Sequence, residues 1–143
     1  MAETTQIQPD KVRAYLATDY RLGQAAQDIV LTIGQRSERL AALFAAKGVN
    51  CGAFLTAYNP RGTLQTEAAN QLAHAQLATQ LEQLGHAVIE GSGSEEGTDW
   101  AAEESYFALG MALEPAKAMG THFDQDAIVW VGADAVPQLI LLR

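Results

Sequence analysis

The segment from about residue 66 to 84 constrains the fold more than any other part of this sequence. At 100° per residue its apolar side chains fall within about 80° of arc, which is typical of an amphipathic helix. The apolar stripe consists of Ala73, Leu77, Leu81 and Leu84. Gly85 ends the helix. A helix with one apolar face must pack on another layer of the same domain, so the chain needs a sheet or further helices to cover it.

Shorter segments on both sides of this helix supply that layer. Helices are predicted at 9–18, where Pro9 suits the first turn, at 37–48, where Ser37 is an N-cap and Gly48 a C-terminus, and at 114–120. Apolar or β-branched runs predict strands at 27–33, 51–58, 86–90, 105–111, 127–131 and 138–142. The last two strands are expected to form a hairpin.

The alternation predicts an α/β fold: a mixed β-sheet of about six strands with three to four packed helices. Residues 9–143 are expected to form a single domain, preceded by a flexible segment at 1–8. The glycine- and serine-rich segment 91–98 is expected to be a mobile surface loop, with a lid over a site as the more specific interpretation.

The composition excludes several classes of protein. The 143 residues carry a formal charge of −8 and no basic stripe, which argues against nucleic acid binding. Cys51 is the only cysteine, so no internal disulfide is expected, and a buried structural thiol is its default role. No signal peptide and no apolar run long enough to span a bilayer is found, so a cytoplasmic location without membrane contact is expected.

Several groups of residues resemble one family. They are Thr56-Ala57-Tyr58-Asn59-Pro60, then Glu67 with Asn70, Trp100 followed by Glu103-Glu104-Ser105, and Phe123, Gln125 and 127–130. In this order and spacing they resemble the uncharacterised bacterial family called domain of unknown function 3293. The resemblance implies a small single-domain bacterial protein and no assigned activity. It also favours a strand over a helix at 105–111.

Asn70 is the most informative single residue. It lies a heptad before Leu77, about 20° from the centre of the apolar stripe, so its amide is expected to be buried. A buried amide without partners costs roughly 1–3 kcal/mol. Two roles are therefore open: a structural hydrogen bond to a loop backbone, or one wall of a polar pocket at the edge of the sheet.

The turn Asn59-Pro60-Arg61-Gly62 leads from a strand into the same helix. A helix N-terminus attracts anions, and Arg61 is a candidate to bind a carboxylate or phosphate in a bidentate manner. Two alternatives stand against this hypothesis. Glu67 in the first turn of the helix is placed to occupy its N-terminus, and asparagine–proline turns are common without any ligand.

Glu103 and Glu104 must face opposite sides of a strand, so only one of them can point into a given site. Glu104 is favoured, as a candidate general base or as an ion-pair partner of Arg61. Gln125 is expected to close a turn, or to orient a ligand in the same pocket. The histidines His74, His86 and His122 have no metal-ligand spacing, so no metal and no cofactor is expected, and His74 is expected at the surface or boundary.

These observations leave two functional hypotheses. The first is a protein or enzyme that binds a small anionic ligand in a polar pocket lined by Asn59, Arg61, Asn70, Glu104 and Gln125. The second is a module without a catalytic site, such as an inhibitor or adaptor, that binds a protein partner through its acidic surface.

Overall fold

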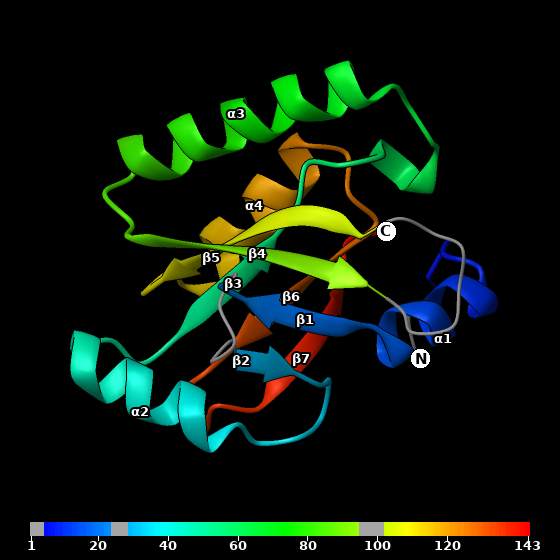
Figure 1. The fold of residues 1–143 in the computed structure, drawn as a ribbon. Helices are drawn as coiled ribbons and strands as arrows, with labels where there is room; N and C mark the ends of the chain where they lie inside the picture. The colour runs from blue at the N-terminus through cyan, green and yellow to red at the C-terminus, as the bar shows by residue number, and fades with distance from the viewer. Residues whose placement is uncertain (1–4, 24–28, 95–101) are drawn as a thin grey trace.

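The structure is a computed structural model that describes residues 5–23, 29–94 and 102–143. Within these residues four α-helices pack on one seven-stranded sheet, which confirms the α/β class (Figure 1). The helices are α1 (Pro9–Ala17), α2 (Glu38–Lys47), α3 (Glu67–Gln83), α4 (Leu113–His122) and a short 3₁₀ turn, η1 (Pro60–Gly62). The strands are β1 (Asp19–Leu22), β2 (Ile29–Leu31), β3 (Gly52–Leu55), β4 (Val88–Ser94), β5 (Glu103–Leu109), β6 (Ala127–Val131) and β7 (Pro137–Leu141). None of the described helices is long and apolar enough to cross a membrane.

The strands follow the order β2-β1-β4-β5-β3-β6-β7, and every pairing among the described residues is antiparallel. The expectation of a mixed sheet is therefore corrected, for a topological reason. Helix α3 leads from β3 to β4, which are parallel to each other, but β5 lies between them. In the same way α4 leads from β5 to the parallel strand β6, and β3 lies between these two. The parallel strands are thus next-nearest neighbours.

The segment β3-α3-β4-β5-α4-β6 consequently has the βαββαβ topology of ferredoxin-like folds. Figure 1 shows both of its helices, α3 and α4, on one side of the sheet, and α2 on the other side. The elements outside this segment extend the sheet at both edges and cover the face that α3 and α4 leave open. The predicted terminal hairpin is confirmed as β6 and β7.

Two helices begin with a side-chain cap at the position where the sequence predicts the helix to start. The Thr66 hydroxyl at the start of α3 accepts a hydrogen bond from the Ala69 amide at 3.1 Å. The Ser37 hydroxyl does the same for the Leu40 amide at the start of α2, also at 3.1 Å. Gly48 ends α2 in the left-handed conformation, with φ at 68°. These contacts join residues close in sequence, and for that reason the pattern of residues reveals them.

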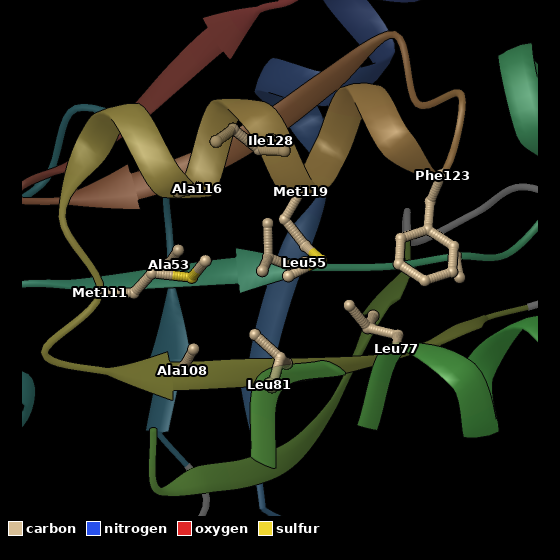
Figure 2. Packing of buried hydrophobic residues seen from close by; sticks show 11 residues of the cluster. Ala53, Leu55, Leu77, Leu81, Ala108, Met111, Ala116, Met119, Phe123 and Ile128 are labelled. Atoms are coloured by element: carbon tan, nitrogen blue, oxygen red, sulfur yellow. The ribbon is translucent and has the colours of Figure 1, made fainter. Parts of the chain in front are cut away.

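One apolar core lies between the sheet and the helices α3 and α4 (Figure 2). Leu77 and Leu81 of α3 and Met119 of α4 converge on Leu55 of β3. Leu77 and Leu81 are fully buried, which confirms this part of the predicted apolar stripe as the inner face of α3, but Leu84 is 55% exposed and lies beyond the end of the helix at Gln83. Each buried leucine contributes roughly 1.5–3 kcal/mol by leaving water.

A second core lies on the opposite face of the sheet, where α2 packs. Phe54 and Leu55 are adjacent in β3 and belong to different cores, as strand alternation requires. Phe54 joins Phe107 of β5 and Phe44 of α2, and the rings of Phe44 and Phe107 stack with centroids 6.3 Å apart. The central strands are therefore apolar on both faces.

Two segments differ from the sequence-based expectation. Strand β1 was not predicted, because its four residues include two charged ones that alternate with buried Tyr20 and Leu22. Residues 91–94 are not a loop but the end of β4, and they pair with β1 and β5. A Cβ at Gly91 would lie 2.3 Å from the Arg21 carbonyl oxygen, so glycine permits close strand contact there.

Parts of three predictions lie outside the described residues. These are 1–4 of the N-terminal segment, 27–28 of the strand expected at 27–33 and 95–98 of the expected loop. In the rest of that N-terminal segment, Ile7 is buried and the Thr5 hydroxyl donates a hydrogen bond to the Arg143 carbonyl.

Candidate functional site

A cavity of about 340 Å³ lies between α1 and the face of the sheet that α3 and α4 leave open. This volume is in the range of sites for small organic molecules. Strands β1, β3, β4, β5, β6 and β7 contribute to its walls, and the chain between β3 and α3 closes one end. The polar residues that line it are Lys11, Tyr15, Thr18, Thr56, Asn59, Ser94, Glu103, Ser105 and Gln125.

Aromatic rings form part of the apolar wall of the cavity, together with aliphatic residues such as Val129 of β6 and Leu139 of β7. Tyr20 of β1 and Phe54 of β3 meet edge to face, with centroids 5.3 Å apart. Gly93 of β4 is paired with Tyr20, and its missing side chain leaves space beside the ring. The Tyr20 hydroxyl donates a hydrogen bond to the Tyr15 carbonyl at 2.7 Å, which fixes α1 over the sheet.

A chain of amides forms the polar end of the cavity. The Asn70 side-chain oxygen accepts a hydrogen bond from the Asn59 backbone amide at 2.9 Å, and the Asn70 NH₂ group donates to the Asn59 side-chain oxygen at 3.0 Å. The Asn59 NH₂ group in turn donates to Glu103 Oε2 at 2.9 Å. Asn70 therefore orients Asn59, and Asn59 orients the one carboxylate among the described lining residues.

The turn that carries Asn59 adopts an unusual backbone conformation. Asn59, Arg61 and Asp124 all lie in the left-handed region, with φ of 44°, 57° and 55°. The Arg61 amide donates to the Asp124 carbonyl at 2.8 Å, and the Gln125 side-chain NH₂ group donates to the Tyr58 carbonyl at 3.1 Å. The loop between α4 and β6 thus holds the turn against the end of the sheet. Such conformations persist where neighbouring contacts enforce them.

A buried carboxylate links α1 to the C-terminal residue. The Asp126 side chain is 2% exposed, and it accepts hydrogen bonds from Lys11 Nζ at 2.7 Å and from Arg143 at 2.8 Å. Lys11 also donates to the Arg61 carbonyl at 2.8 Å. This group of Lys11, Asp126 and Arg143, which we call the charged triad, has a net positive charge.

Tyr15 lies near both carboxylates at this end of the cavity. Burial, followed by the negative charges of Asp126 and Glu103, raises the pKa of Tyr15 to about 12. The phenol therefore stays protonated at neutral pH and can donate a hydrogen bond. The turn 59–62 contacts Glu103 through the Asn59 NH₂ group and Lys11 through the Arg61 carbonyl, so Glu103 and the charged triad lie at the same end of the cavity.

A family model described as protein of unknown function (DUF3293) matches residues 55–128, which is more than half of the chain. The chain belongs to this family. The resemblance found in the sequence is thereby confirmed. No curated protein and no solved structure matches the chain. The match extends from the end of β3 into β6 and covers most of the βαββαβ segment.

In this DUF3293 protein, three of the five residues proposed from sequence meet at the polar end of the cavity. Asn59 and Gln125 line it directly. Asn70 is buried as expected, and it forms the structural hydrogen bond to a loop backbone that was one of its two predicted roles. It stands behind Asn59 instead of lining the cavity.

The other two residues do not reach the cavity. The Arg61 side chain is largely exposed and lies 3.8 Å from Asp124, so its expected ion pair with Glu104 is not formed. Glu103 and Glu104 do face opposite sides of β5, but Glu103 is the one that points into the cavity. Glu104 instead contacts α3, where it accepts a hydrogen bond from Gln71 at 3.1 Å.

Sequence reasoning missed four residues of the site: Lys11, Tyr15, Glu103 and Asp126. Lys11 and Tyr15 are four residues apart in a helix that was predicted, so they share one face, which is a usable signal. Both precede the segment that matches the DUF3293 model, whereas Glu103 and Asp126 lie inside it.

A second polar cluster lies on the opposite face of the sheet, under α3. His74 was expected at the surface or boundary, but it is buried and stacks on Tyr106 with centroids 4.3 Å apart. Its Nε2 lies 3.7 Å from Glu104, and its Nδ1 is buried without a hydrogen-bond partner. Burial lowers the pKa of His74, and the negative charges of Glu104 and Glu90 oppose this shift.

Proposed function

We propose that this DUF3293 protein binds a small amphipathic molecule with an anionic group in the cavity between α1 and the sheet. One observation carries the proposal: the cavity has an aromatic wall at Tyr20 and Phe54 and an end of oriented polar groups at Asn59 and Glu103. Apolar walls with a few placed polar groups are typical of sites for small molecules.

Lys11 has the role that was predicted for Arg61, which is to contact the anionic group of the ligand. It lines the cavity and belongs to a triad of net positive charge, whereas Arg61 is exposed and paired with Asp124. A ligand anion near Lys11 would gain a charge-assisted hydrogen bond, which is roughly twice as strong as a neutral one. The charge of the triad supports an anionic group on the ligand.

The function proposed is binding, without a covalent step. The Ser105 hydroxyl donates to the Glu103 carbonyl oxygen at 3.1 Å, and burial keeps the Tyr15 phenol protonated. Neither group is activated as a nucleophile in this arrangement.

The test is heat unfolding of the full chain in the presence of small aromatic and branched aliphatic carboxylates, each with and without an α-amino group. A ligand at ten times its Kd adds about 1.4 kcal/mol of stability, which raises the Tm of a domain of this size by roughly 4–6 °C. We expect at least one member of the panel to produce such a shift. No shift with any member would contradict the proposal.

Gly93→Val supplies the blocked variant. A Cβ at Gly93 would have its nearest neighbours, Thr18 and Tyr20, at 3.6–3.9 Å, so a larger side chain is accommodated only by filling the cavity. Ser92→Val is the matched control, because it adds a valine to the adjacent position of the same strand, which faces the other way. We expect the ligand shift to disappear in Gly93→Val and to persist in Ser92→Val. The acidic interaction module predicts no ligand shift in any of these proteins.

A further inference from the structure

We infer that the ligand is zwitterionic: an amino acid or a similar compound that carries an ammonium group, a nearby carboxylate and an apolar side chain. This inference rests on the proposed function and narrows its ligand class. The observation behind it is that two side chains of opposite charge, Lys11 and Glu103, line one cavity that also has an apolar wall with two aromatic rings.

Lys11 offers the contact for the ligand carboxylate. Its ammonium group has three N–H donors, and two of them are directed to the Arg61 carbonyl and to Asp126. The third is left for a group in the cavity. Asp126 does not cancel the attraction, because it is shared with Arg143 and the triad stays positive overall. The lack of a side chain at Gly62 leaves room for the Lys11 ammonium group, since a Cβ at residue 62 would lie 2.7 Å from Nζ.

Glu103 offers the contact for the ligand ammonium group. A carboxylate only accepts hydrogen bonds, so its natural partner in a ligand is a cationic N–H group. The Asn59 NH₂ group holds Oε2 at 2.9 Å, and Asn70 holds Asn59, so the carboxylate is oriented before a ligand arrives. Such preorganisation lowers the entropy lost on binding.

The two charges select against ligands that carry only one. A carboxylate without an amine would meet the negative charge of Glu103, and an amine without a carboxylate would meet the positive triad. Both charges lie at the same end of the cavity, because the turn 59–62 contacts Glu103 through the Asn59 side chain and Lys11 through the Arg61 carbonyl. A zwitterion satisfies both, and its apolar side chain then extends toward Tyr20 and Phe54. The volume of about 340 Å³ accommodates a side chain such as that of leucine or phenylalanine.

Calorimetric titration of the full chain with two matched sets of compounds tests the inference. The first set is phenylalanine, 3-phenylpropionate and 2-phenylethylamine, and the second is leucine, 4-methylpentanoate and isoamylamine. We expect the amino acid of at least one set to bind at least tenfold more tightly than both of its analogues. Equal or tighter binding of an analogue overturns the inference but leaves the proposed function standing. If no member of either set binds, the inference is also overturned, and the wider carboxylate panel then decides on the proposed function.

The variant Glu103→Gln distinguishes a direct contact with the ligand from a purely structural role of this residue. Glutamine keeps the shape of the side chain and can still accept the hydrogen bond from Asn59, but it removes the negative charge. We expect amino acid binding to weaken at least tenfold and binding of the matched carboxylate to strengthen, so that the preference reverses. Glu104→Gln, on the opposite face of the same strand, is the control and should leave both affinities unchanged. Parallel losses for both compounds in Glu103→Gln, or an unchanged preference, would contradict the assignment.

Discussion

Asn59 and Asn70 form a reciprocal pair of amides in which each side chain is a donor or acceptor for the other residue. Both are nearly fully buried, and Asn59 is at the same time the contact that holds Glu103. A single residue therefore links the core under α3 to the cavity on the other face of the sheet.

Asn70→Ala is expected to lower the free energy of unfolding by about 2–3 kcal/mol, because it removes the hydrogen bond between the two side chains and leaves the buried Asn59 backbone amide without its acceptor. Urea unfolding measures the change. Leu72→Ala on the exposed side of the same helix is the control and should change stability by about 0.5 kcal/mol or less. If Asn70→Ala loses no more free energy of unfolding than Leu72→Ala, the amide pair does not stabilise the fold.

Arg61 illustrates a different effect at the same scale. Its φ of 57° is unfavourable for a residue with a long side chain, and its ion pair with Asp124 is exposed. Asparagine tolerates this conformation better. We expect Arg61→Asn to raise the free energy of unfolding by about 0.5–1 kcal/mol in urea titrations. Ligand binding should stay the same, and a loss of binding would restore Arg61 to the site.

At the scale of elements, β5 decides which carboxylate belongs to the cavity. Strand alternation sends Glu103 and Ser105 toward α1 and Glu104 and Tyr106 toward α3. The same alternation separates the two cores, so each central strand serves both faces. Helix α4 is held on one of these faces by very close packing at Gly120.

Gly120→Ala separates helix propensity from packing. Propensity alone would stabilise α4 by about 1 kcal/mol, but a Cβ at this position would lie 2.6 Å from Ile128 and 2.7 Å from Leu142. We expect a net destabilisation of about 1–3 kcal/mol, measured by urea unfolding. Ala118→Gly, at an exposed position of the same helix, should cost about 1 kcal/mol from propensity. If Gly120→Ala stabilises the protein, the packing argument fails.

At the scale of the whole molecule, the sheet has two faces with different roles. The α3 and α4 face is the apolar core of the βαββαβ segment and contains the buried His74. The opposite face is covered by α1 and α2, and the cavity lies where α1 crosses it. Ligand binding and the pH dependence of stability, which we attribute to His74 below, are therefore expected to depend on different faces of one sheet.

His74 makes the stability of the whole domain depend on pH. Burial lowers its pKa in the folded state, so the unfolded chain takes up the proton first as the pH falls. This contribution to stability is fully present above about pH 6.5 and is lost as the pH falls from there toward the folded pKa. We expect the wild type to lose more stability between pH 7 and pH 5 than His74→Phe, which keeps a ring against Tyr106 without a titrating group.

Denaturant midpoints at a series of pH values measure this difference. If both proteins lose the same stability between pH 7 and pH 5, the pKa of His74 is not lowered in the folded state and the prediction is wrong. Glu104, Glu90, Tyr58 and Tyr106 surround the ring and are unchanged in the variant, so their own titration cancels in the comparison.

The sequence alone determined the features that depend on neighbours a few residues away. The cap at Ser37, the position of Leu77 and Leu81 on the inner face of α3, the burial of Asn70 and the terminal hairpin all follow from local spacing. Periodicity and capping act within one or two helical turns, which is why they are legible in a single chain.

The tertiary structure alone decided the order of the strands and the contacts between site residues that are distant in sequence. Lys11 meets Asp126 across 115 positions of sequence, and Asn59 meets Glu103 across 44. The insertion of β5 between β3 and β4 made the pairing antiparallel, and the position of α1 selected Glu103 over Glu104. Such choices depend on which surfaces pack together once the chain has closed its long loops, and no local pattern of residues encodes them.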